Sequence, residues 1–162
     1  MSKILVIDDQ RSIRKTLKEI LEYEGNEVVL AENGPEGLQF IDDDKFDIIL
    51  CDIKMPEMDG NEATKIIRAM ADPRKRHVPI IAMTAHAMQG DKERILEVGM
   101  DDYISKPFEP KLFINKVAIW LGRSLKAQNK QSDTVQQMIS ERFSDLQGID
   151  LVDGLRRVQG DY

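Results

Sequence analysis

The stretch FDIILCD, residues 46–52, contains four successive apolar residues, 48–51, and then ends in a carboxylate, Asp52. A strand has this pattern when both of its faces are buried, because an exposed face would place a polar residue at every second position. We therefore expect residues 46–52 to form the central strand of a sheet. The following residues, IKMPEMDG, contain the Pro and Gly of an abrupt turn. Aspartate is common where strands end, so the meaning of Asp52 depends on which other polar residues reach the same edge.

Strand-like and helix-like segments alternate along the first 122 residues. Apolar residues recur at helical spacing between the expected strands, and Gly25 and Gly99 are natural helix ends. This alternation predicts an α/β fold, a doubly wound five-stranded parallel sheet with five helices. The other expected strands are residues 3–8, 27–31, 78–85 and 102–105; the expected helices contain residues 13–21, 38–41 and 61–70, a segment ending at Gly99, and residues 110–121.

Composition excludes several classes of protein. The chain of 162 residues is 41% hydrophobic, which is enough for a core, and its net charge is −6 with no basic run longer than Arg74-Lys75-Arg76. An acidic chain of this kind predicts no direct nucleic-acid binding. No apolar stretch approaches the roughly 20 residues that span a bilayer, and the start lacks a signal peptide, so we expect a cytoplasmic protein. The single cysteine, Cys51, excludes an intrachain disulfide and is interpreted as a core residue.

Five polar residues follow or end the expected strands: Asp8, Asp9, Asp52, Thr84 and Lys106. The carboxyl ends of parallel strands share one edge of the sheet, which is where such folds carry their functional groups. Three carboxylates placed that close need a counter-charge, and Mg²⁺ takes carboxylate and carbonyl oxygens as ligands. A metal, a lysine, a hydroxyl and a nucleophilic carboxylate together indicate a phosphoryl-transfer centre. The simpler alternative is that the two adjacent aspartates cap the first helix and Lys106 is a surface charge.

These landmarks resemble the receiver domain of two-component response regulators. The matching residues are Asp8-Asp9 after KILVI, Asp52 before MPEMDG, Thr84 in IIAMTA and Lys106-Pro107 after DDYIS. The resemblance covers about residues 1–122 and implies a flavodoxin-like fold with strand order 2-1-3-4-5.

The resemblance also implies a role for each site residue. Asp52 would be the phosphoacceptor. Asp9, Asp52 and the backbone carbonyl of Lys54 would bind Mg²⁺, with Asp8 acting through a bound water. Gly60 would permit the close turn before the next helix.

Further roles concern the phosphoryl group and the switch. Lys106 would hold a phosphoryl oxygen, with Pro107 after a cis bond, while Thr84 moves toward the phosphoryl group and Tyr103 rotates inward. His86 and Lys54, two positions after Thr84 and Asp52, would lie at the rim of the site and slow the loss of phosphate. The fourth expected helix, the fifth strand and the fifth helix would form the face that changes, and a possible homodimer would use the same face.

The remainder of the chain suggests a subfamily. Residues 123–147 are expected to be a linker with an amphipathic helical segment, and residues 148–162 resemble the start of a histidine-containing phosphotransfer domain. The receiver itself is similar to those within hybrid sensor histidine kinases. The expected partner is a histidine kinase or a histidine phosphotransfer protein.

Two other functions remain open at this point. A phosphohydrolase of the haloacid dehalogenase type also uses Asp and Mg²⁺, but it requires a second aspartate two residues after the nucleophile, where Lys54 stands. A constitutive interaction module would not turn over phosphate at all. In the favoured interpretation the domain catalyses its own phosphorylation and dephosphorylation but serves chiefly in signalling.

Overall fold

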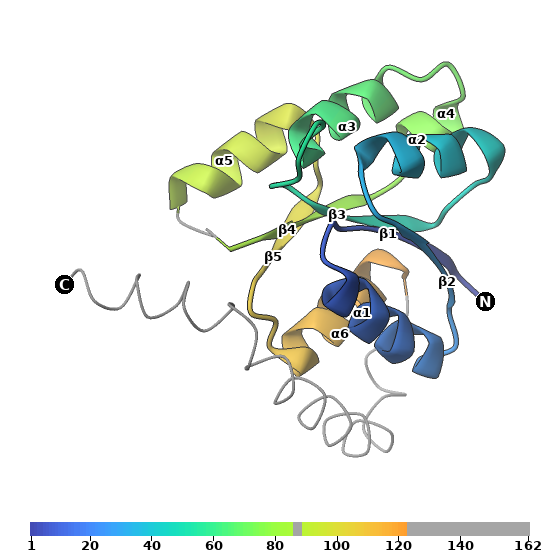
Figure 1. The fold of residues 1–162 in the computed structure, drawn as a ribbon, viewed down its shortest axis with the longest axis vertical. Coiled ribbons are helices and arrows are strands. Elements are labelled where there is room, and N and C mark those ends of the chain that lie inside the picture. The colour runs from blue at the N-terminus through green and yellow to red at the C-terminus, as the bar shows by residue number, and fades with distance from the viewer. Residues whose placement is uncertain (86–88, 123–162) are drawn as a thin grey trace. The chain divides into compact units, whose positions relative to one another are not determined.

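The protein forms a five-stranded parallel sheet with strand order β2-β1-β3-β4-β5, which confirms the predicted fold (Figure 1). The structure, a computed structural model, describes residues 1–85 and 89–122. The elements are β1 (Lys3–Ile7), α1 (Arg11–Tyr23), β2 (Glu27–Ala31), α2 (Gly34–Asp43), β3 (Ile48–Asp52), α3 (Gly60–Arg68), α4 (Pro73–Arg76), β4 (Ile80–Thr84), α5 (Gln89–Val98), β5 (Asp102–Ser105) and α6 (Pro110–Trp120).

The chain divides into two compact units, the first of which, Met1–Ser105, contains the whole sheet. In this unit α1 lies on one face of the sheet, and α2, α3 and α5 lie on the other (Figure 1). The second unit begins at Lys106 and contains α6. The ring of Phe108, just before this helix, and the ring of Phe113, within it, have centroids 5.4 Å apart.

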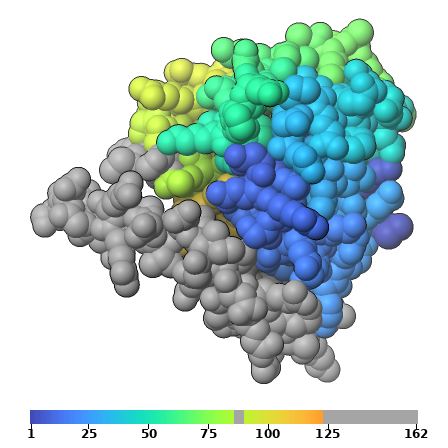
Figure 2. All heavy atoms as spheres, in the orientation of Figure 1, coloured from blue at the N-terminus to red at the C-terminus, as the bar shows by residue number. Residues whose placement is uncertain are grey.

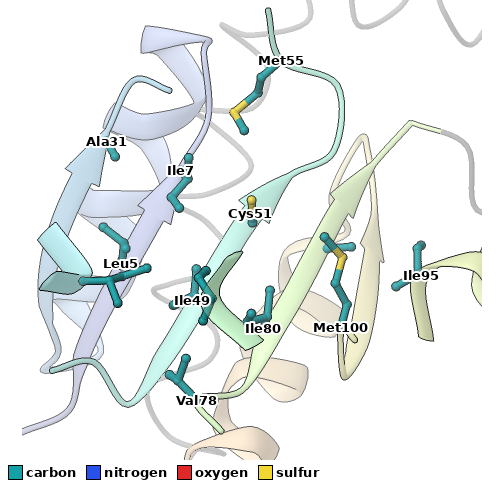
Figure 3. Close-up of a cluster of buried hydrophobic side chains, with 13 residues drawn as sticks. Leu5, Ile7, Ala31, Ile49, Cys51, Met55, Val78, Ile80, Ile95 and Met100 are labelled. Atoms are coloured by element: carbon teal, nitrogen blue, oxygen red, sulfur yellow. The ribbon is translucent and has the colours of Figure 1, made fainter. Parts of the chain in front are cut away.

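Alternate residues of the strands fill the layer beneath α2, α3 and α5. Leu5, Ile49 and Ile80 come from three neighbouring strands and belong to one buried cluster (Figure 3). Cys51 is a member of the same cluster, as predicted. Every residue of β3 is buried, as expected of a central strand covered on both faces.

The predicted number of helices was wrong, because α4 was not foreseen. This helix is a single turn that begins with Pro73 after Asp72, whose carboxylate accepts a hydrogen bond from the backbone N–H of Arg74 at 2.9 Å. Asp before Pro is a good helix start, since Asp caps the first turn and proline lacks the N–H that would go unpaired. The helix has only four residues, too few for a helical apolar pattern to show.

Element bounds agree with the predictions to within a few residues, with β3 and β4 each two residues shorter at their start than expected. The expected linker and phosphotransfer segment, residues 123–162, and the rim residue His86 lie outside the described residues. Among the helices within residues 1–85 and 89–122, none combines the length and apolarity needed to cross a membrane.

The Lys3 side chain connects the amino end of β1 to neighbouring segments. The ammonium of Lys3 pairs with Asp44 and, at 3.3 Å, with Glu27, and it lies 5.7 Å from the centroid of the Phe46 ring. Lys3 thereby links its strand to β2 and to the segment between α2 and β3.

The Arg68 side chain connects α3 to the segments just before β4 and β5. The guanidinium of Arg68, at the end of α3, donates to the carbonyls of Gly99, Arg76 and Val78 and to the carboxylate of Asp101, all at 2.7–2.8 Å. This side chain thus holds three backbone carbonyls and one carboxylate at the amino edge of the sheet.

Candidate functional site

Three carboxylates meet at the carboxyl edge of the sheet. Asp8 directly follows β1, Asp52 ends β3, and the ligand oxygens of Asp8, Asp9 and Asp52 all lie within 4.8 Å of one another. Parallel pairing of Ile7 with Cys51 brings these two strand ends level. Asp8 is fully buried and Asp52 is 6% exposed, whereas Asp9 is exposed. In Figure 2 the start of α1 (blue) adjoins the turn between β3 and α3 (green), so the cluster lies where these two segments meet.

The first aspartate is fixed by its neighbours on three sides. The Asp8 carboxylate accepts a hydrogen bond from the backbone N–H of Gln10 at 2.9 Å, and the Asp8 N–H donates to the Ala31 carbonyl at 3.1 Å. The Asp8 carbonyl accepts from the Arg14 guanidinium at 2.8 Å. Arg14 was not among the predicted site residues. It adjoins the apolar stripe of its helix, and a charged residue there gives no sign in the sequence that it is buried.

The turn after Asp52 is as tight as the MPEMDG motif predicts. A Cβ at Gly60 would lie 2.4 Å from the Asp52 carbonyl oxygen, so no other residue fits without moving the backbone. The Gly60 N–H donates to the Ile53 carbonyl at 2.9 Å, which closes the turn. Asp59 then caps α3 by accepting from the Glu62 N–H at 2.8 Å. Glycine is required here for close approach, and the predicted role of Gly60 is confirmed.

Cys51 lies next to the carboxylates but is not a reactive group. Its thiol is buried and lies 3.4 Å from the Asp52 carbonyl oxygen. Burial raises the pKa of the Cys51 thiol far above its usual range, and the charges of Asp52 and Asp8 raise it further. A thiol that stays protonated is a poor nucleophile and metal ligand, so Cys51 serves the core.

The donor set of the cluster fits a hard divalent cation. All three side chains offer carboxylate oxygens, the ligands that Mg²⁺ prefers, and the mutual distances suit a single ion. Two of the three carboxylates are buried, where like charges are screened least. A cation bound there would offset that repulsion.

The other predicted residues that the structure describes lie on strands of the sheet or just after them. Thr84 is buried at the end of β4 and is paired in register with Ser105, the last residue of β5. Tyr103 is partly buried against the core cluster. Lys54 is exposed in the turn after β3. Lys106 follows Ser105 as the first residue of the second unit, and its bond to Pro107 is cis.

Comparisons with known proteins agree with this geometry. The family model of the response regulator receiver domain matches residues 4–118. The chain is 34% identical over 161 residues to the sensor protein GacS of Pseudomonas syringae pv. syringae, covering 98% of this chain. It is 38% identical over 119 residues to the polar-differentiation response regulator DivK of Brucella anthropi, covering 74% of this chain and 95% of DivK.

A solved structure is similar over the same region. It is the receiver domain of the sensor histidine kinase PA1611 from Pseudomonas aeruginosa PAO1, with a magnesium ion coordinated in its active site cleft. Its TM-score is 0.67 at 36% identity, covering 75% of this chain and 98% of that one. The chain spans 17% of the length of the sensor protein and nearly all of DivK. The family match covers more than half of the chain and includes all three carboxylates, so this chain belongs to the response regulator receiver domain family.

Proposed function

We propose that this chain is the phosphoacceptor module of a phosphorelay and takes a phosphoryl group onto Asp52 from a phosphohistidine partner in the presence of Mg²⁺. The observation that carries the proposal is the cluster of three carboxylates within 4.8 Å, with Asp52 at the end of the central strand. Asp9 and Asp52 would hold the ion together with the backbone carbonyl of Lys54. Asp8 would act through a bound water, and one of its oxygens accepts from the Gln10 N–H.

The transfer step requires little movement of the protein. A carboxylate oxygen of Asp52 attacks phosphorus, the P–N bond of the phosphohistidine breaks, and the leaving imidazole keeps the electron pair and takes a proton from solvent. The bound cation would offset charge on the phosphoryl oxygens during this transfer. The tight turn at Gly60 keeps the Asp52 backbone fixed, and fixed groups contribute most to such a step. Lys106 is expected to donate to a phosphoryl oxygen.

The proposed switch uses residues at the ends of β4 and β5. The Thr84 hydroxyl would move toward the phosphoryl group, and Tyr103 would turn further inward and change the face that contains α5 and β5. The partly buried position of Tyr103 against the core supports a small rotation rather than a large one. A preference of a few kcal/mol is enough to shift such an equilibrium.

Hybrid kinases among the relatives support a place within a larger signalling protein. The phosphodonor would then be the histidine of a kinase or of a phosphotransfer domain. The haloacid dehalogenase alternative is not favoured, because Lys54 stands where that class needs its second aspartate.

Intact mass after incubation with acetyl phosphate tests the proposal. We expect one phosphate adduct on the full chain with Mg²⁺, and none after chelation of the metal or in Asp52→Asn. Asp59→Asn is a matched control: Asp59 is a nearby exposed carboxylate that caps α3, and asparagine caps equally well. That control should accept phosphate as the wild type does.

Two results would count against the assignment. An adduct that persists in Asp52→Asn would place the phosphoacceptor elsewhere. An inert wild type with Mg²⁺ present would favour a constitutive interaction module, and steady release of phosphate from small phosphate esters would favour a hydrolase.

A further inference from the structure

A buried arginine, Arg14, contacts the backbone between the two adjacent aspartates. The Arg14 side chain is only 9% exposed, and its guanidinium donates to the carbonyl of Asp8 at 2.8 Å in a buried hydrogen bond. That carbonyl belongs to the peptide unit joining Asp8 to Asp9. Since a peptide unit is planar and rigid, holding its oxygen also sets the direction in which the backbone of Asp9 leaves. One side chain therefore constrains both carboxylates.

The second partner of Arg14 is too exposed to account for its burial. A second guanidinium nitrogen lies 3.6 Å from a carboxylate oxygen of Glu32, and the Glu32 side chain is 71% exposed. An ion pair with so exposed a partner is strongly screened and contributes little. The short bond to Asp8 is buried and charge-assisted, which makes it the stronger of the two.

Glu32, the weaker partner of Arg14, is itself held by hydrogen bonds at the start of α2. The Glu32 N–H donates to the Glu36 carboxylate at 2.7 Å, and the Glu36 N–H donates to the side chain of Asn33, the N-cap of α2, at 2.8 Å. The guanidinium therefore spans two strand ends, from the Asp8 carbonyl after β1 to Glu32 after β2. Its planar fork suits two partners in fixed directions, which a lysine ammonium cannot reproduce.

We propose that Arg14 is a positioning residue of the cation site, which holds the Asp8–Asp9 peptide unit so that both carboxylates point at one ion. The proposal rests on the Mg²⁺ binding proposed above. The positive charge of Arg14 by itself opposes cation binding, so charge and geometry predict opposite effects when Arg14 is replaced. Loss of positioning weakens Mg²⁺ binding, whereas simple loss of the charge strengthens it.

Isothermal titration of Mg²⁺ into the folded full chain separates the two effects. For Arg14→Gln we expect about tenfold weaker binding, at the lower end of the range seen when an outer-shell contact to a metal ligand is removed. Arg14→Lys keeps the charge but not the fork, and binding should be at least about threefold weaker. Arg11→Gln removes an equal charge from an exposed position on the same helix, and binding should stay within about twofold of the wild type.

A purely structural role would lower the free energy of unfolding of the Arg14 variants and leave the Mg²⁺ dissociation constant of the folded protein unchanged. The amide resonance of Asp9 in Mg²⁺-free protein provides a second readout, since it should shift in both Arg14 variants and much less in Arg11→Gln. Unchanged or tighter binding in Arg14→Gln overturns the proposal. If that variant does not fold, wild-type binding by Arg14→Lys overturns it instead. Failure of the wild type to bind Mg²⁺ overturns the proposed function, which is a different result.

Discussion

At the amino edge of the sheet, charges of opposite sign pair with each other, whereas at the carboxyl edge three carboxylates lie together. Lys3 contacts Asp44 and Glu27 beside β1, and Arg68 contacts Asp101 beside β4. Both edges are built by the same five strands. The difference therefore comes from the residues at the ends of the strands and in the segments next to them.

The contrast indicates which edge serves stability and which serves binding. The paired charges at the amino edge stabilise the folded chain without any bound ligand. The three carboxylates within 4.8 Å at the carboxyl edge repel one another and destabilise the folded chain unless a cation is bound. Substitutions at the amino edge should therefore change the free energy of unfolding, and substitutions at the carboxyl edge should change ligand affinity.

Arg68→Met should have the largest effect. Four hydrogen bonds to three carbonyls and to Asp101 would be lost, and the part-buried acceptors would be left without them. We expect the free energy of unfolding in urea to fall by about 2–3 kcal/mol, with Mg²⁺ affinity of the folded protein within about twofold. Arg74→Met, at an exposed position of α4, is the control and should change stability by less than about 0.5 kcal/mol. A loss below about 1 kcal/mol, or a large loss of Mg²⁺ affinity, would contradict the division between the edges.

Asp9→Asn should show the opposite behaviour. As the expected direct ligand, Asp9 contributes both charge and geometry, so Mg²⁺ should bind at least about tenfold more weakly, or about 1.4 kcal/mol. Asp8→Asn should lose less, since asparagine still accepts from the Gln10 N–H. In Mg²⁺-free buffer the free energy of unfolding of Asp9→Asn should not fall, because one of three like charges has gone. Equal losses of affinity in the two variants would refute the assigned roles, and a clear loss of stability would break the comparison.

Lys54→Ala probes the rim of the carboxyl edge. The Lys54 side chain is exposed and cationic, so it should hinder water from reaching the phosphoryl group without activating it. Its removal, or His86→Ala, should speed loss of phosphate from Asp52 by up to about tenfold. Lys65→Ala, exposed on α3, is the control and should leave the decay unchanged. Decay that is unchanged or slower in both rim variants would reject steric shielding.

The sequence was a good guide wherever a short local pattern carries the information. Successive apolar residues located β3, and a carboxylate at its end marked the site, because strand ends in a parallel sheet must converge. The MPEMDG motif located the turn at Gly60. Glycine is needed there because the backbone passes close to the Asp52 carbonyl oxygen. The single cysteine was correctly assigned to the core from its apolar neighbours.

Long-range polar contacts could not be predicted in this way. Arg68 meets Gly99 and Asp101 more than thirty positions away, and Lys3 meets Asp44 across a similar separation. Nothing in either local pattern marks the partner. Arg14 was missed for a related reason. Its buried guanidinium donates to a backbone carbonyl, and since every residue has such a carbonyl, no side chain in the sequence marks the partner.

The smallest effect is expected from the pH dependence of the Lys3–Asp44 pair. The Lys3 side chain, followed by the N–H of Lys45, holds the pKa of Asp44 below its usual value, and Asp44 in turn raises the pKa of Lys3. A lowered carboxyl pKa adds stability above the unfolded value near 3.9, and this stability is lost as pH falls through the folded pKa. The raised lysine pKa adds stability that is lost only as pH rises above about 10.4. The pair is therefore fully effective at neutral pH.

Asp44→Asn should accordingly lower the urea midpoint at pH 7, and its difference from the wild type should shrink as pH falls from about 4 to about 2. Asp43→Asn is the matched control, since Asp43 is the preceding acid and accepts from Gln39 at 3.2 Å rather than from a cation. A midpoint difference for Asp44→Asn that stays constant or grows below pH 4 would show that the loop carboxylate acts through its shape and not its charge. The amino edge would then no longer stand as the charge-paired counterpart of the three carboxylates.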